Sequence, residues 1–243
     1  MSNTRPIYVF IGLMTLTALS TVGYAGFASH TPHMLLALPV LALASASSRM
    51  KVKLPGINGN MSVNLPFLLS AIVNLSAAEA VLITCASTVL QCWPRKNTNI
   101  NRQQMTFNLS MMAFATAIAS LLGHAKWIPS STTSLHGVLS LLLASAALFL
   151  GQTAPVAGIV ALTEGKSTIN VWRQIAQLSF PYYVLSAGVT SMLQAVGGHP
   201  GWGLALAVFP VMYAIHRSYR MYFNRVGEST HPQVLVRAAG AGK

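Results

Sequence analysis

One carboxylate, Glu79, lies deep within an apolar part of the chain. Residues 62–93 read SVNLPFLLSAIVNLSAAEAVLITCASTVLQCW and hold no other charged side chain. An ionisable residue at membrane depth is a functional candidate, because burying its charge is unfavourable. Glu79 can therefore bind a cationic ligand or a proton. The alternative is structural: Ser76-Ala-Ala-Glu79 matches the S-x-x-E capping box, in which each side chain satisfies a backbone amide of the other residue.

Neutral polar residues of this stretch and of other apolar runs can complete a cavity around this carboxylate. We expect Asn74, Asn108 and Gln152 to line the same cavity as Glu79. Tyr182 and Tyr183 follow a proline near the start of an apolar run, where proline disturbs a helix little, and their rings can line a pocket. Such aromatic residues also pack helices together or lie in the membrane interface, and that alternative stays open.

A metal site has weaker support. His30 and His33 lie in a short polar turn and can bind zinc or copper, or report external pH through imidazole titration. Histidine is equally an ordinary loop residue, so this alternative stays open. Cys85 and Cys92 have neither zinc-site spacing nor a C-x-x-C motif, and we expect ordinary apolar side chains there.

The shortage of acids argues against catalysis. The chain has three Glu and no Asp, whereas a Ser-His-Asp arrangement and phosphoryl transfer both need carboxylates. We expect no enzymatic activity and no cofactor.

The element that positions Glu79 must fold back on itself. As one straight helix, residues 62–93 would run about 48 Å, against a hydrocarbon core of about 30 Å. We predict a helix at about 63–75, a turn at Ser76 and a second helix at 77–93. Arg95 and Lys96 follow, so both arms should begin and end on one side. Either both arms cross the membrane or they form a re-entrant pair, which the short first arm favours.

Composition places the whole chain in lipid. Of 243 residues, 53% are hydrophobic and only 7% are charged, where soluble domains are about a quarter charged. The net charge of +12 comes from short cationic clusters between apolar runs, as is typical of topology determinants. We therefore expect the lipid bilayer, and no nucleic acid, as partner.

The predicted fold is an all-α polytopic membrane protein with six spanning helices plus the helical hairpin, or up to eight crossings. The expected spans are residues 7–25, 34–48, 105–123, 135–163, 178–196 and 202–215. Residues 151–155 (GQTAP) should kink or break the fourth span, Gly165 should end it, and residues 167–174 should lie in the interface. Period-two alternation at residues 50–65, around Pro-Gly and Asn-Gly, predicts a small β-hairpin at the inner surface.

The cations favour one topology, with both termini in the cytoplasm of a bacterial cell and the chain in its inner membrane. The first apolar run could instead be a cleaved signal peptide, but its length of near 20 residues favours a retained helix. We expect one integral membrane domain at residues 1–225 and a flexible cytoplasmic tail at residues 226–243.

Several short segments carry a resemblance to a known family. The chain resembles the polytopic N-terminal sensory region of certain bacterial diguanylate cyclases and HD-type cyclic-di-GMP phosphohydrolases. The segments are Ser62-Val-Asn-Leu-Pro-Phe67, Trp93 with its basic loop, Phe107-Asn108, Ala161-Leu-Thr-Glu-Gly165, Pro181-Tyr-Tyr183 and Arg217-Ser-Tyr-Arg220. The catalytic motifs of those enzymes do not occur in this sequence.

The resemblance implies a sensor-like module that binds a small ligand and signals to a separate cytoplasmic protein. The Glu79 hairpin and the outer half of the bundle would then form the ligand cavity. The short broken helices are also similar to substrate-binding subunits of energy-coupling vitamin transporters, so the alternative is a substrate-binding subunit that works with other transporter subunits.

Overall fold

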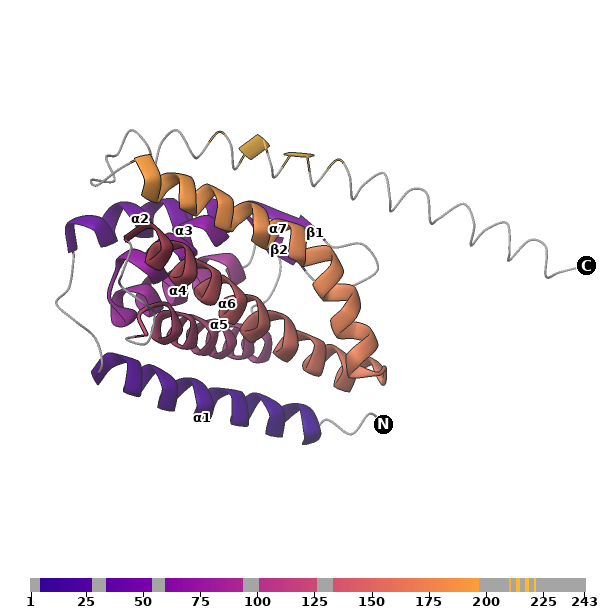
Figure 1. The fold of residues 1–243 in the computed structure, drawn as a ribbon. Helices are drawn as coiled ribbons and strands as arrows, with labels where there is room; N and C mark the ends of the chain where they lie inside the picture. The colour runs from indigo at the N-terminus through magenta and orange to yellow at the C-terminus, as the bar shows by residue number, and fades with distance from the viewer. Residues whose placement is uncertain are drawn as a thin grey trace, which may run out of the picture.

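The computed structural model describes residues 5–27, 34–53, 60–93, 101–125 and 133–196, and six single positions between 210 and 221. Over these residues the chain forms seven α-helices and one pair of short strands. The elements are α1 (Arg5–Phe27), α2 (Met34–Ser48), β1 (Lys51–Lys53), β2 (Asn60–Ser62), α3 (Leu65–Asn74), α4 (Ala77–Cys92), α5 (Arg102–Gly123), α6 (Thr133–Glu164) and α7 (Thr168–Val196). Figure 1 shows α1 along one edge of the bundle and α7 along the opposite edge, with α5 and α6 between them.

The long apolar stretch breaks at Ser76, as predicted. Helix α3 ends at Asn74, α4 begins at Ala77, and Ser76 has extended backbone geometry. The Glu79 backbone N–H donates to Ser76 Oγ at 3.3 Å, and Glu79 Oε2 accepts from the Ser76 backbone N–H at 3.0 Å. Ser76 Oγ also donates to Glu79 Oε2 at 2.7 Å. The predicted capping box is therefore formed.

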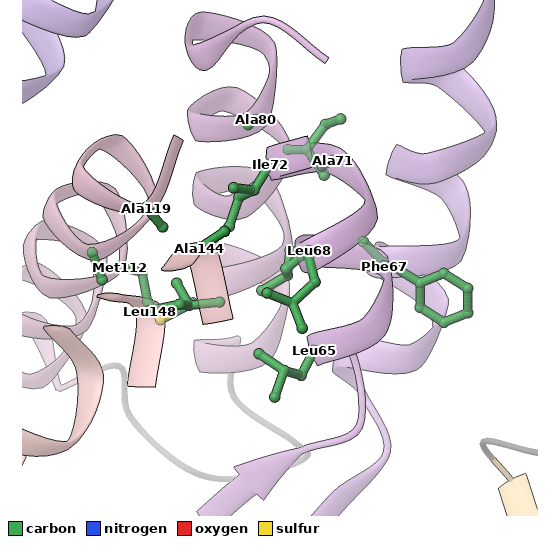
Figure 2. Close-up of a cluster of buried hydrophobic side chains, with 14 of the residues drawn as sticks. Leu65, Phe67, Leu68, Ala71, Ile72, Ala80, Met112, Ala119, Ala144 and Leu148 are labelled. Atoms are coloured by element: carbon green, nitrogen blue, oxygen red, sulfur yellow. The ribbon is translucent and has the colours of Figure 1, made fainter. Parts of the chain in front are cut away.

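Helix α3 lies at the centre of the bundle. Its residues from Leu65 to Leu69 are all buried, and Leu69 and Ile72 have no exposed surface. Figure 2 shows Leu68 and Ile72 directed toward Ala144 and Leu148 of α6, whereas Phe67 extends from the other side of α3. A helix that is apolar on every side is one buried in a core.

Among the described residues, many small and hydroxyl side chains are buried between the helices, and many large apolar side chains are exposed. Ala115, Thr116 and Ala119 of α5 are completely buried, whereas Leu16 and Leu19 of α1 are 65% and 66% exposed. Water would favour the reverse arrangement, but small residues and hydroxyl groups are what membrane helices use to pack together. By length and composition, three of the helices that the structure describes could span a membrane, namely Arg5–Phe27, Arg102–Gly123 and His136–Glu164. The coarse class, a helical membrane protein, agrees with the prediction.

The predicted break in the fourth span does not occur. Helix α6 continues through Gly151 and Pro155 as one helix of 32 residues. A Cβ added at Gly151 would lie 2.8 Å from the Cβ of Ala115 and 3.0 Å from its Cα. The glycine therefore lets α6 approach α5 closely, and this packing outweighs the local tendency of Gly and Pro to end a helix.

The end of α6 follows the prediction, whereas the start of α7 does not. Gly165 has a φ of 65°, and the Lys166 N–H bonds to the Ala161 carbonyl at 3.2 Å, which is the long bond of a Schellman motif. The span predicted at residues 178–196 begins earlier in the structure, because residues from Thr168 onward belong to α7, and the interfacial place of residues 167–174 stays a prediction. Helix α7 contains Pro181 and bends along its length (Figure 1), and proline is an ordinary cause of such a bend.

Strands β1 and β2 pair antiparallel, with Val52 opposite Met61, inside the region predicted as a hairpin. The Val63 N–H also bonds to the Met50 carbonyl at 3.2 Å, so the pair joins the end of α2 to the start of α3. The hairpin's own turn, His30 and His33, most of the predicted span at 202–215 and the predicted tail at 226–243 lie outside the described residues.

Candidate functional site

A cavity of about 380 Å³ opens between the helices. Residues of α1, α3, α4, α5, α6 and α7 line it, together with Asn64 and Asn101 just before α3 and α5. The polar lining residues are Asn64, Thr88, Gln91, Asn101, Gln103, Gln104, Asn108, Gln152, Thr153, Thr163, Ser179, Tyr182 and Tyr183. Within the described residues, no charged or histidine side chain lines this cavity. Its volume lies in the lower part of the range for small-molecule sites.

The cavity lies at the end of the bundle that carries the cations. Figure 1 shows the start of α1, the β1–β2 pair and the turn between α6 and α7 at the same end. The start of α5 joins them, because Gln103 Nε2 donates to the Tyr8 hydroxyl at 2.5 Å. We call this end, which holds Arg5, Arg49, Arg102, Lys166 and Arg173, the basic end. Over the part of the chain that the structure describes, the opposite end carries no Lys or Arg.

Gln152 and Tyr183 form a polar contact in the part of the cavity farthest from the basic end. The Tyr183 hydroxyl donates to Gln152 Oε1 at 2.5 Å and joins α7 to α6. The ring of Phe149 meets the Tyr183 ring edge to face, with centroids 5.0 Å apart and an interplanar angle of 79°. Tyr183 is only 6% exposed. The ring contact and the hydrogen bond together fix the tyrosine and, through it, the Gln152 side chain.

Tyr182 ties α7 to α3. Its hydroxyl accepts a hydrogen bond of 3.3 Å from the Leu65 N–H, one of the backbone donors that the start of a helix leaves unsatisfied. About two turns further along α7, Thr190 Oγ1 donates to the Pro66 carbonyl at 3.2 Å. The same helix that shapes the cavity thus also holds the first turn of α3 in place.

Asn108 lines the cavity from α5. Its Nδ2 donates to Cys92 Sγ of α4 at 3.5 Å, a weak bond to sulfur. Gln104 lies four positions earlier on the same helix face and also lines the cavity. The α5 wall therefore presents two amide side chains toward the same space.

The structure brings together four of the six predicted ligand-binding residues: Asn108, Gln152, Tyr182 and Tyr183 all line the cavity. Glu79 and Asn74 do not. On α4, Glu79 lies nine positions from Thr88, about 14 Å of helix. Asn74 is exposed and donates to the Ser70 carbonyl at 2.9 Å. Glu79 and Asn74 therefore belong to the end of the bundle opposite the cavity.

Sequence reasoning did not single out several other polar lining residues. Asn64, Gln91, Gln104 and Ser179 are examples. Two sequence patterns could have pointed to these residues. One is an amide or hydroxyl side chain near the basic end of an apolar helix, and the other is the separation of four positions between Gln104 and Asn108, which places both on one helix face. Those patterns are common, and only the packing of the helices selects the ones that face a shared space.

No group of three or more metal-ligating side chains occurs among the residues described by the structure. The cavity lining consists of neutral oxygen and nitrogen groups with aliphatic, aromatic and methionine side chains. Such a lining can orient a small molecule by hydrogen bonds and bury its apolar surface. Neither a protein-family model, nor a curated protein, nor a solved structure matches this chain.

Proposed function

We propose that the protein is a multi-pass membrane protein that binds a small molecule in the cavity at the basic end and signals its presence to a separate cytoplasmic protein. The observation that carries this proposal is the cavity itself, a space of about 380 Å³ lined by neutral polar groups from six helices. Ligand sites in helical bundles lie between helices in this way.

The charge distribution supports an orientation with the basic end in the cytoplasm of a bacterial cell. The cavity would then open toward the cytoplasm, not toward the outer half of the bundle as the Glu79 hypothesis expected. In this orientation the described helices α1, α2, α5, α6 and α7 would cross the membrane, and the α3–α4 pair would enter and leave from the cytoplasmic side. Residues 202–215 would supply a further crossing.

Signalling is favoured over transport by the place of the cavity. Transporters bind substrates at broken helices that both faces can reach in turn. Here the break at Ser76 lies eight positions beyond Leu68, the cavity-lining residue of α3 nearest the break, and neither Ser76 nor Glu79 lines the cavity. A cavity away from that break, with Ser179, Tyr182 and Tyr183 of α7 in its wall, suits a module that reports occupancy through that helix.

Native mass spectrometry of the protein, purified in mild detergent, tests the proposal. We expect a retained small molecule, and we expect its occupancy to fall in Gln152→Met and Asn108→Leu variants. Gln177→Met is the matched control, because Gln177 is exposed on α7 and does not line the cavity. A molecule retained equally by all variants would place the site elsewhere.

A further inference from the structure

We infer that the cavity selects an uncharged molecule with a hydrogen-bond acceptor that receives the Gln152 side-chain amide. This inference rests on the proposed function and names the chemical class of its ligand. Three properties of the cavity carry it: the absence of a counter-charge, the orientation of Gln152, and the order of polar and apolar groups along its depth.

The first property is the lack of a counter-charge. Among the described residues that line the cavity there is no Asp, Glu, Lys, Arg or His. An ion taken from water into a low-dielectric site is strongly disfavoured unless an opposite charge or several hydrogen bonds compensate it. Both carboxylates and ammonium groups would therefore bind poorly beside Gln152. A neutral polar group meets no such penalty.

The second property is the orientation of Gln152. Its Oε1 accepts the Tyr183 hydroxyl proton, so its Nε2 group supplies the two remaining donors. No described residue accepts a hydrogen bond from this Nε2, and Gln152 lines the cavity. A half-buried amide whose oxygen already accepts a hydrogen bond from a fixed tyrosine is set to donate through its nitrogen. It complements a carbonyl, hydroxyl or ring-nitrogen acceptor.

The third property is the order of groups along the cavity. On α6 the lining residues run from Gln152 to Thr163, eleven positions or about 16 Å of helix. Between these two polar ends lie Val156, Ile159 and Val160, and Phe107 faces the same space from α5. The ligand would therefore place its hydrogen-bond acceptor near Gln152, at the end of the cavity farthest from the basic end, and its apolar part along the middle of the cavity.

A matched set of probes tests this selection. Benzamide, benzoate and benzamidine have nearly the same shape but are neutral, anionic and cationic at pH 7. Each probe is added at millimolar concentration to the full chain in lipid nanodiscs, and thermal unfolding is followed. We expect benzamide to raise the Tm, and benzoate and benzamidine to bind at least about tenfold more weakly.

Variants at position 152 make the test specific. Gln152→Glu keeps the acceptor for Tyr183 but replaces the donor with a charge. It should weaken benzamide binding by roughly tenfold, the effect of one lost hydrogen bond in a dry site, and should make benzamidine the preferred probe. Gln152→Met should lose benzamide binding and gain neither ion. Gln177→Glu carries the same charge change at an exposed site and should keep the preference of the wild type.

The outcomes separate this inference from the proposed function. Equal binding of the ionic probes, or a Gln152→Glu variant with unchanged preference, would overturn the ligand class while leaving a small-molecule site in place. If no probe binds but native mass spectrometry finds a retained molecule, a neutral molecule supports the inference and an ionic one overturns it. If no probe binds and nothing is retained, the proposed function fails as well.

Discussion

The Tyr183 hydroxyl lies 2.5 Å from Gln152 Oε1 and forms a polar link between α7 and α6 in the cavity wall. Both residues come from apolar runs separated by the turn at Gly165, where one helix ends and the next begins. The contact fixes the direction of the Gln152 amide and couples the position of α7 to the wall of the cavity. The account of ligand binding therefore depends on this pair.

Removing the Tyr183 hydroxyl should uncouple the pair. Tyr183→Phe is expected to lower the free energy of unfolding by about 1 to 3 kcal/mol, because the partly buried Gln152 carbonyl loses its donor. A double-mutant cycle with Gln152→Met should give a coupling energy of about 0.6 to 1.7 kcal/mol, the range of hydrogen bonds between membrane helices. Reversible unfolding in detergent measures both quantities. Additive effects of the two substitutions would show that the bond does not stabilise the bundle.

The capping box should stabilise the start of α4. Ser76→Ala and Glu79→Ala are each expected to lower the free energy of unfolding by about 1 kcal/mol, and the double variant by less than the sum, since the two side chains serve one another. Glu79→Gln should be nearly neutral, because glutamine also completes the box.

The same variant separates the capping role from a ligand role. If the carboxylate of Glu79 held a ligand, Glu79→Gln would abolish stabilisation by that ligand and leave the fold intact. We expect ligand-dependent stabilisation to persist in Glu79→Gln, as the cavity is lined by other residues.

Two glycines of α6 should respond in opposite directions to the same substitution. Gly151→Ala would set a Cβ 2.8 Å from the Ala115 Cβ and is expected to cost about 1 to 3 kcal/mol of stability by overpacking. Gly137 has no atom within 4 Å of its added Cβ, so Gly137→Ala should be neutral or stabilising by up to about 1 kcal/mol. Thermal unfolding of the two variants side by side measures the difference. Equal stabilities would mean that α5 and α6 are not in close contact at Gly151.

Features set by neighbouring residues were predictable from the sequence. The helix break at Ser76 follows from a capping box of four residues, and the end of α6 follows from the backbone freedom of Gly165. Neither depends on how distant parts of the chain pack. The coarse membrane class was equally accessible, because it follows from composition.

Features set by packing between helices were not predictable. Gly151 and Pro155 lie within an unbroken α6 because Gly151 packs on Ala115, a residue 36 positions earlier in the chain. The cavity likewise depends on the rotation of six helices about their axes, which weak local patterns do not define. Glu79 was predicted as a ligand-binding residue because it is the only acidic residue in the apolar stretch at residues 62–93. The residues that line the cavity are instead neutral amides and other groups at the other end of the bundle.

The central claim is that α5 crosses the membrane with the cavity facing the cytoplasm, and cysteine labelling tests it most directly. Single cysteines at Arg102 and His124, at the two ends of α5, are introduced after Cys85 and Cys92 are changed to serine. A membrane-impermeant maleimide is then applied to bacterial cells that express the protein. We predict labelling of His124→Cys in intact cells and of Arg102→Cys only after permeabilisation. Labelling of both positions from the same side, or of Arg102→Cys alone in intact cells, would contradict the account.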